Sequence, residues 1–149
     1  MWTLKFFSSF KGIAPLFLRA AIGYSFFWVH GKDKLLSGEG FGTFDWGKDF
    51  VASVPKFMTD TPPAWMLYTA AWTEFLAGAA LLLGLLTRWA SVGLLAVMAY
   101  AIFKVHGADP YLKKELAIGY AAALSALLTL GAGPMSVDRL LLGTAGGGD

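Results

Sequence analysis

The chain has 149 residues, of which 56% are hydrophobic and 15% are charged, and its mean hydropathy is +0.58. An average soluble domain carries about 25% charged residues, so this chain has too few to cover a soluble core of its own size. The formal net charge is only +2 and the 12 Lys and Arg residues are scattered, which argues against a nucleic-acid binder. The absence of cysteine excludes disulfides, thiolate metal sites and covalently attached c-type haem. The composition therefore predicts an integral membrane protein.

Four apolar stretches are long enough to cross a hydrocarbon layer of about 30 Å, which takes roughly 20 helical residues. A tight turn at Thr87 and Arg88 separates the second stretch from the third, so these two helices are expected to be antiparallel neighbours. The predicted fold is all-α, an integral membrane four-helix bundle with antiparallel up-down-up-down topology, forming one transmembrane domain over residues 1–149. The expected spans are residues 14–34, 63–86, 89–106 and 115–132.

One long connection, residues 35–61, joins the first two spans. From Trp46 onward its apolar residues Trp46, Phe50, Val54 and Phe57 fall at helical spacing, which is typical of a short helix lying in the membrane interface. The alternative is a loop whose aromatic side chains cap the bundle. At the other end of the chain, the Gly-rich tail 143–149 is expected to be flexible.

Ionisable side chains within the spans are candidate functional residues, because a charge inside a membrane needs a partner or a function. A rise of about 1.5 Å per residue places Glu74 near mid-membrane and Arg19 within reach of it from the first helix, so the sequence predicts an Arg19–Glu74 pair. Arg88 lies close to four turns from Glu74 and is expected to share its face. Such a pair either fixes the register of the helices or takes part in substrate binding or proton transfer.

A second polar cluster is expected at the membrane surface where the long loop lies. His30, His106 and Glu115 are the candidate catalytic residues there, and Lys34 joins them as a ligand-binding candidate beside Arg19, Glu74 and Arg88. The alternative for both histidines is a satisfied interfacial side chain. Haem held between them is geometrically possible, but no haem motif supports it and a shallow site would leave the porphyrin exposed. We expect no metal and no intrinsic cofactor.

Small residues predict where the helices approach each other closely. Gly23, Gly78, Gly84 and Gly119 are the expected contact points. On the last span, small residues form a narrow seam that is polar only at its two ends, and we expect this seam to pack against another helix. Its members are Glu115, Gly119, Ala122, Ala126 and Thr129.

Three segments resemble the DoxX family of small four-helix bacterial membrane proteins. They read LRAAIGYSFFWVHGKDKLL, TEFLAGAALLLGLLTRWAS and KKELAIGYAAALSALLTLGAGPMSVDRLL. The resemblance covers nearly the whole chain except residues 35–61. The positions that match the family's pattern are Arg19, Gly23, His30, Gly31, Lys34, Glu74, Gly78, Gly84, Thr87, Arg88, His106, Glu115, Gly131, Gly133, Ser136 and Asp138.

The resemblance implies a small subunit of the bacterial inner membrane. Some members are similar to the quinone-linked membrane subunits of thiosulfate oxidation, and others belong to oxidative-stress or sulfur-handling assemblies. A quinone would then be a diffusible ligand, the partners would be the lipid bilayer and other subunits, and any activity would be that of an oxidoreductase subunit. The alternatives are a non-catalytic structural or assembly subunit and, more weakly, a small transporter or proton conduit, for which the sequence shows no evident pair of broken helices.

An even number of spans places both termini on the same side of the membrane. The Lys and Arg count alone favours a cytoplasmic long loop. A long aromatic loop with an interfacial helix, however, is more typical of an outer face, and Lys5 and Lys11 flank the first span. We therefore expect both termini in the cytoplasm.

Overall fold

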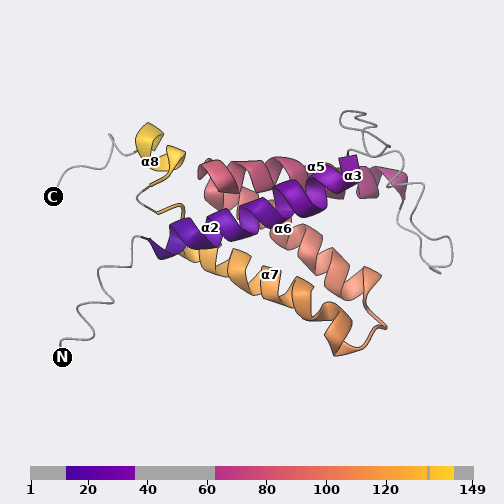
Figure 1. The fold of residues 1–149 in the computed structure, drawn as a ribbon. Helices are drawn as coiled ribbons and strands as arrows, with labels where there is room; N and C mark the ends of the chain where they lie inside the picture. Colours follow the sequence, from indigo (N-terminus) through magenta and orange to yellow (C-terminus); the bar gives the residue numbers. More distant parts are fainter. Residues whose placement is uncertain (1–12, 36–62, 134, 143–149) are drawn as a thin grey trace, which may run out of the picture.

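A computed structural model describes residues 13–35, 63–133 and 135–142 of the chain. These residues are helical throughout their regular elements and contain no strand, which confirms the all-α class for this part of the chain (Figure 1). The elements in chain order are α2 (Ala14–Tyr24), the π-helix η1 (Ser25–Gly31), α3 (Lys32–Leu35), α5 (Ala64–Leu83), α6 (Thr87–Tyr100), the π-helix η2 (Ala101–Val105), α7 (Tyr111–Leu130) and α8 (Val137–Leu142).

Proline and glycine set the helix boundaries. Pro63 and Pro110 are the extended N-cap residues of α5 and α7, where a missing N–H costs nothing because the first turn leaves it unpaired anyway. α5 ends at Gly84, whose φ of 67° is left-handed. The N–H of Gly84 donates to Leu81 O at 3.1 Å and the next N–H donates to Ala80 O at 2.8 Å, the pattern of a Schellman ending. The turn therefore lies at residues 84–86, slightly earlier than predicted.

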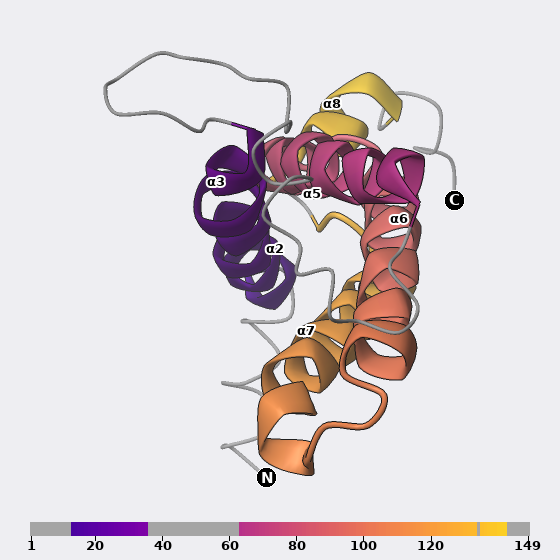
Figure 2. The same cartoon turned by 90° about the vertical axis from the view of Figure 1, so that its right-hand side faces the viewer.

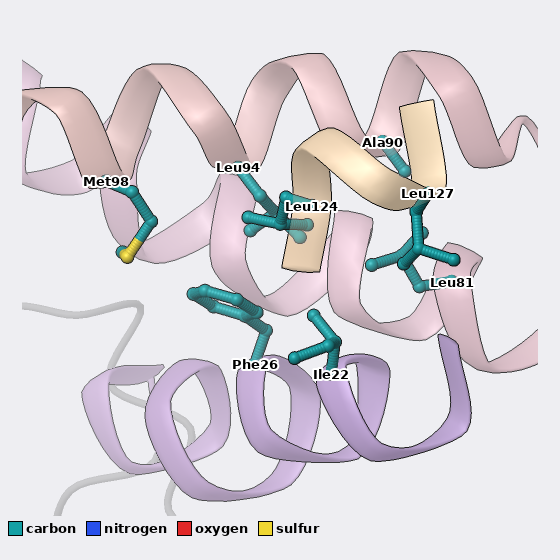
Figure 3. Close-up of a cluster of buried hydrophobic side chains, with 8 residues drawn as sticks. All are labelled: Ile22, Phe26, Leu81, Ala90, Leu94, Met98, Leu124 and Leu127. Carbon is teal, nitrogen blue, oxygen red and sulfur yellow. The ribbon is translucent and has the colours of Figure 1, made fainter. Parts of the chain in front are cut away.

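The helical segments pack as neighbours in chain order. The first segment, which consists of α2, η1 and α3, contacts α5. α5 contacts α6, α6 contacts α7, and α7 in turn contacts α2 (Figures 1 and 2). Their shared core contains Phe26 and Ile22, which point from the first segment toward leucines of the other three (Figure 3). The buried core residues are Ile22, Phe26, Leu81, Ala90, Leu94, Met98, Leu124 and Leu127.

Glycines bring the first segment and α5 into backbone contact. A Cβ on Gly23 would lie 2.8 Å from Leu82 N, and one on Gly31 would lie 2.6 Å from the Cα of Phe75. A Cβ on Gly78 would collide with the backbone of Phe27. The prediction that Gly23 and Gly78 are close-contact points is therefore confirmed.

The seam on α7 is a different case, and the prediction that it packs against a helix is wrong. Gly119, Ala122 and Thr129 are exposed, and a Cβ on Gly119 would have no atom within 4 Å. The buried face of α7 consists of Leu124 and Leu127 instead, because larger apolar side chains fill the space between four helices better than small ones do.

The first segment and α5 form one pair, α6 and α7 form the other, and the two pairs separate toward one end of the molecule. The elements are close together where α2 begins and α7 ends, whereas α6 and α7 run away from α3 toward the turn that joins them (Figures 1 and 2). Phe26 is fully buried between the helices, and its ring lies 5.0 Å from that of Tyr120 on α7. These bulky rings hold η1 and α7 apart at a level where glycines hold η1 and α5 together.

Two described helices are long and apolar enough to cross a membrane. They are Ala64–Leu83 and Thr87–Val105, each with a mean hydropathy of 1.4, and only 22% and 17% of their apolar windows are buried. They correspond to two of the four predicted spans. α8 was not predicted, and the predicted interfacial helix and the Gly-rich tail lie outside the described residues.

Candidate functional site

The acidic side chain in the middle of α5 is buried and ion-paired. Glu74 is 3% exposed, and its Oε2 accepts a hydrogen bond from Lys34 Nζ at 2.5 Å. Lys34 belongs to α3, and its side chain is 25% exposed. The partner of Glu74 is therefore Lys34, at the open end of the molecule, and the predicted Arg19–Glu74 pair is wrong.

The π-helix η1 joins Lys34 to the rest of the first segment. Its wider turns include a hydrogen bond from the N–H of Lys32 to Phe27 O, five residues earlier. Gly31 within it lies against the backbone of α5 at Phe75. The backbone that carries Lys34 is therefore close to the part of α5 that carries Glu74. π-helical turns inside α-helices are rare and occur frequently at functional sites.

His30 lies four residues before Lys34 and contacts a different helix. Its ring is 5.8 Å from that of Phe26 and 5.8 Å from that of Tyr120, which it meets edge-on at 86°. The first segment thus contacts α7 through His30 and α5 through Lys34. We call His30, Lys34, Glu74 and Tyr120 the inner polar site.

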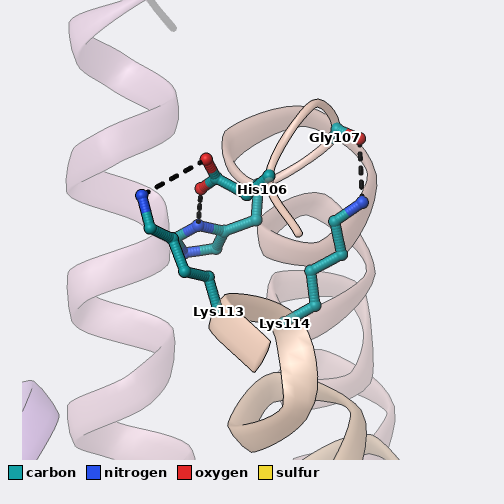
Figure 4. Close-up of polar contacts among 5 residues, drawn as sticks. His106, Gly107, Lys113 and Lys114 are labelled. Atoms are coloured by element: carbon teal, nitrogen blue, oxygen red, sulfur yellow. Dashed lines mark hydrogen bonds and ion pairs between the residues drawn. The ribbon is translucent and has the colours of Figure 1, made fainter. Parts of the chain in front are cut away.

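His106 is separate from the inner polar site, and the predicted cluster of four residues does not form. The Nδ1 of His106 lies 2.8 Å from Oδ2 of Asp109, and the other carboxylate oxygen of Asp109 lies 3.5 Å from Lys113 Nζ (Figure 4). The hydrogen bond from His106, together with the Lys113 charge, lowers the pKa of Asp109 below its ordinary value. The α6–α7 turn that carries His106 lies well away from α3, because the helices diverge at this end.

Glu115 faces a groove between α2 and α7. The groove has a volume of about 560 Å³ and is otherwise lined by Ile22, Leu112, Leu116, Gly119 and Tyr120. Glu115 is exposed. Tyr120 belongs both to this groove and to the ring contacts of His30, so it connects Glu115 to the inner polar site.

Arg19 lies at the opposite end, where the chain folds back after α7. It is 3% exposed, and its Nη2 donates to Met135 O. Its Nε and Nη1 have no hydrogen-bond partner among the described residues. Gly84 leaves the space that the guanidinium fills, since a Cβ there would collide with Nη1. Glu74 precedes Gly84 by ten residues, or about 15 Å along α5, which is why Arg19 does not reach it.

Asp138 organises this end of the molecule. Its carboxylate accepts hydrogen bonds from the N–H groups of Leu86 at 2.6 Å and Thr87 at 2.9 Å, which caps α6, and its own N–H donates to Gly84 O at 2.9 Å. Sequence reasoning missed this role. An S-x-D pattern near the end of the chain was the only signal, and nothing in it pointed to a helix start about 50 residues earlier.

Arg88 does not share a face with Glu74, because α5 ends at Leu83 and Arg88 belongs to the first turn of α6. It is exposed, and its guanidinium lies beside Gly131. Arg19 and Arg88 therefore belong to the end of the molecule near α8, away from the inner polar site. In the part of the chain that the structure describes, no three His, Asp or Glu side chains are grouped so that they could hold a metal ion.

Comparison with protein families gives a match to DoxX over residues 14–107. The matched region contains Arg19, the inner polar residues His30, Lys34 and Glu74, and the turn at Gly84. Comparison with curated proteins gives no match, and neither does comparison with solved structures.

Proposed function

The chain belongs to the DoxX family, and from this premise we propose that it is a small membrane subunit of a quinone-linked redox complex in a bacterial cytoplasmic membrane. In this proposal the four predicted spans insert as an antiparallel bundle with both termini in the cytoplasm. Electrons come from a partner subunit in this proposal, because the chain has no cysteine to hold an iron–sulfur cluster or to form a redox-active disulfide.

The exposed apolar surface supports insertion in a membrane. Soluble monomers rarely expose contiguous apolar patches larger than a few hundred Å². Here large apolar side chains are exposed on every long helix, including Phe17 at 70%, Trp89 at 75%, Phe103 at 76% and Leu116 at 62%. A core helix of a soluble protein would be mostly buried, unlike α5 and the α6–η2 segment.

The Lys34–Glu74 pair, in which Glu74 is buried, is the observation that carries the redox proposal. Burying a charged carboxylate is costly, and polar residues at membrane depth mark ligand and proton pathways. A quinone has two carbonyl oxygens that accept hydrogen bonds, and Lys34, His30 and Tyr120 provide donors beside apolar helices. Reduction to a quinol takes two electrons from the partner and two protons, and His30 and the Lys34–Glu74 pair are suited to hold those protons.

Binding of an oxidised quinone tests the proposal. The protein is reconstituted in lipid nanodiscs and titrated with decylubiquinone and a short-chain menaquinone, with tryptophan fluorescence as the readout. We expect Lys34→Met to weaken binding about tenfold or more and His30→Ala to weaken it about fivefold, since a charged hydrogen bond is worth about 1.5–3 kcal/mol and a neutral one roughly 1 kcal/mol. Ser125→Ala is the control, because Ser125 is exposed on α7 and bonds only its own helix at Ala121 O. No saturable binding of either quinone to the unmodified protein would refute the proposal.

A structural or assembly subunit is the second candidate. Lys34 and Glu74 satisfy each other, and His106 bonds Asp109 within its own turn, as expected for polar groups that only fix helix positions. Deletion of the chain, followed by complementation with Glu74→Gln, separates the two. Restored assembly with quinone reduction at the unmodified rate favours this candidate, whereas restored assembly with lost reduction favours the redox subunit.

A further inference from the structure

We propose that the groove between α2 and α7 binds the reduced form of the quinone, the quinol, with Glu115 accepting a hydrogen bond from its hydroxyl group. This inference rests on the proposed function and adds a second position for its ligand. The groove would be the place where the quinol passes between the inner polar site and the bilayer.

The groove combines an apolar wall with one acidic group. Leu112 and Leu116 line it and are 80% and 62% exposed, so the groove opens on the outer surface of the helices. At Gly119 the space is open, since a Cβ there would touch nothing within 4 Å. An isoprenoid or alkyl tail can lie along such a surface while a ring enters at the open position.

Glu115 has no hydrogen bond or ion pair among the described residues. Its neighbours along α7 are engaged elsewhere, because Lys113 pairs with Asp109 and Lys114 donates to Gly107 O at 2.8 Å (Figure 4). The unpartnered carboxylate beside leucine side chains therefore favours a ligand that brings its own donor.

The direction of that hydrogen bond selects the redox form. An ionised carboxylate only accepts, and a quinone offers carbonyl oxygens that only accept as well. A quinol offers two hydroxyl donors. The ammonium headgroup of phosphatidylethanolamine is another donor on a lipid-soluble molecule, so the experiment must separate the two sources.

Tyr120 links the groove to the inner polar site. It lines the groove near Glu115, and its ring lies 5.8 Å from that of His30 and 5.0 Å from that of Phe26. A quinol ring that leaves the neighbourhood of His30 toward α7 therefore meets Tyr120, which lines the same groove as Glu115.

The test compares decylubiquinol with decylubiquinone in nanodiscs prepared with and without phosphatidylethanolamine. We expect Glu115→Gln to weaken quinol binding about tenfold or more, the loss expected for a charged hydrogen bond, and to leave quinone affinity within about twofold. Gly119→Leu should have the same selective effect by filling the groove, and the open space at this position means that the variant should fold. Ala122→Leu is the matched control, because Ala122 is exposed on the same helix and does not line the groove.

The outcomes distinguish this inference from the proposed function. Quinol affinity unchanged in both Glu115→Gln and Gly119→Leu, with quinone still bound, would overturn the groove site and leave the proposed function standing. If quinol binding appears only when phosphatidylethanolamine is absent and lipid retention depends on Glu115, the groove is a lipid headgroup site and the quinol assignment is wrong. Failure of the unmodified protein to bind either redox form would overturn both proposals.

Discussion

Removal of the Asp138 carboxylate should destabilise the protein, although Asp138 lies beyond the last long helix. Its two oxygens accept from Leu86 N and Thr87 N, and the α6 N-terminus carries a partial positive charge that favours an anion at this position. Replacing an N-cap residue by alanine costs about 0.5–2 kcal/mol. Leu86 is 57% exposed, whereas Thr87 is fully buried, so solvent can replace the lost bond only at Leu86.

The unsatisfied N–H of Thr87 adds about 1–3 kcal/mol. Together the two effects give a loss of about 1.5–5 kcal/mol for Asp138→Ala, which corresponds to a decrease of about 3–20 °C in the unfolding midpoint of a chain of this size. Asp138→Asn keeps one carbonyl acceptor and should lose about half as much.

The effect is measured in detergent as the fraction of protein that stays monodisperse in size-exclusion chromatography after heating to a series of temperatures. Arg139→Ala is the matched control, since Arg139 is adjacent and exposed. Asp138 also interacts electrostatically with the buried Arg19 guanidinium, so Asp138→Ala should cost less in an Arg19→Met background, with a coupling energy of about 0.5–3 kcal/mol. A midpoint for Asp138→Ala equal to that of Arg139→Ala would refute the assignment of Asp138 as the cap of α6.

Three further predictions concern the rest of the molecule. Glu74→Gln should lower the melting temperature because it removes the buried carboxylate that pairs with Lys34, and Lys34→Met should partly restore it in the double variant; equal stability of the single variant and the unmodified protein would contradict the ion pair. Gly78→Val should prevent the close approach of η1 and α5 and reduce the yield of monodisperse protein. His106→Ala should raise the pKa of Asp109 toward its ordinary 3.8, as measured by carboxyl NMR titration. Because the folded pKa of Asp109 is lowered, its stabilising contribution is present above about pH 3.8 and is lost as the pH falls through the folded pKa. A folded pKa of Asp109 that does not change in His106→Ala would be inconsistent with the 2.8 Å contact.

Several features of this protein follow from the sequence alone. Low charge and long apolar runs indicate helices for a membrane, because a chain without a charged surface cannot be solvated as a soluble domain. Local backbone chemistry sets the start of α5 after Pro63, close to the predicted start at residue 63, whereas α5 ends at Leu83 and α7 begins at Tyr111, both earlier than the predicted residues 86 and 115. Gly23 and Gly78 are also predictable from the sequence as contact points, because glycine has no side chain to keep two helix backbones apart.

The pairing of the polar residues was decided by tertiary structure. Helical spacing tells which residues share a face, but not which neighbour that face meets or at what height. Glu74 was therefore assigned to Arg19, although Lys34 is its partner, and Arg19 instead meets a segment that returns more than a hundred residues later. The separation of His106 from His30 likewise depends on how the helices diverge, because the turn that carries His106 lies well away from α3. The space at Gly119 is open because α7 turns Leu124 and Leu127, not its small residues, toward the core.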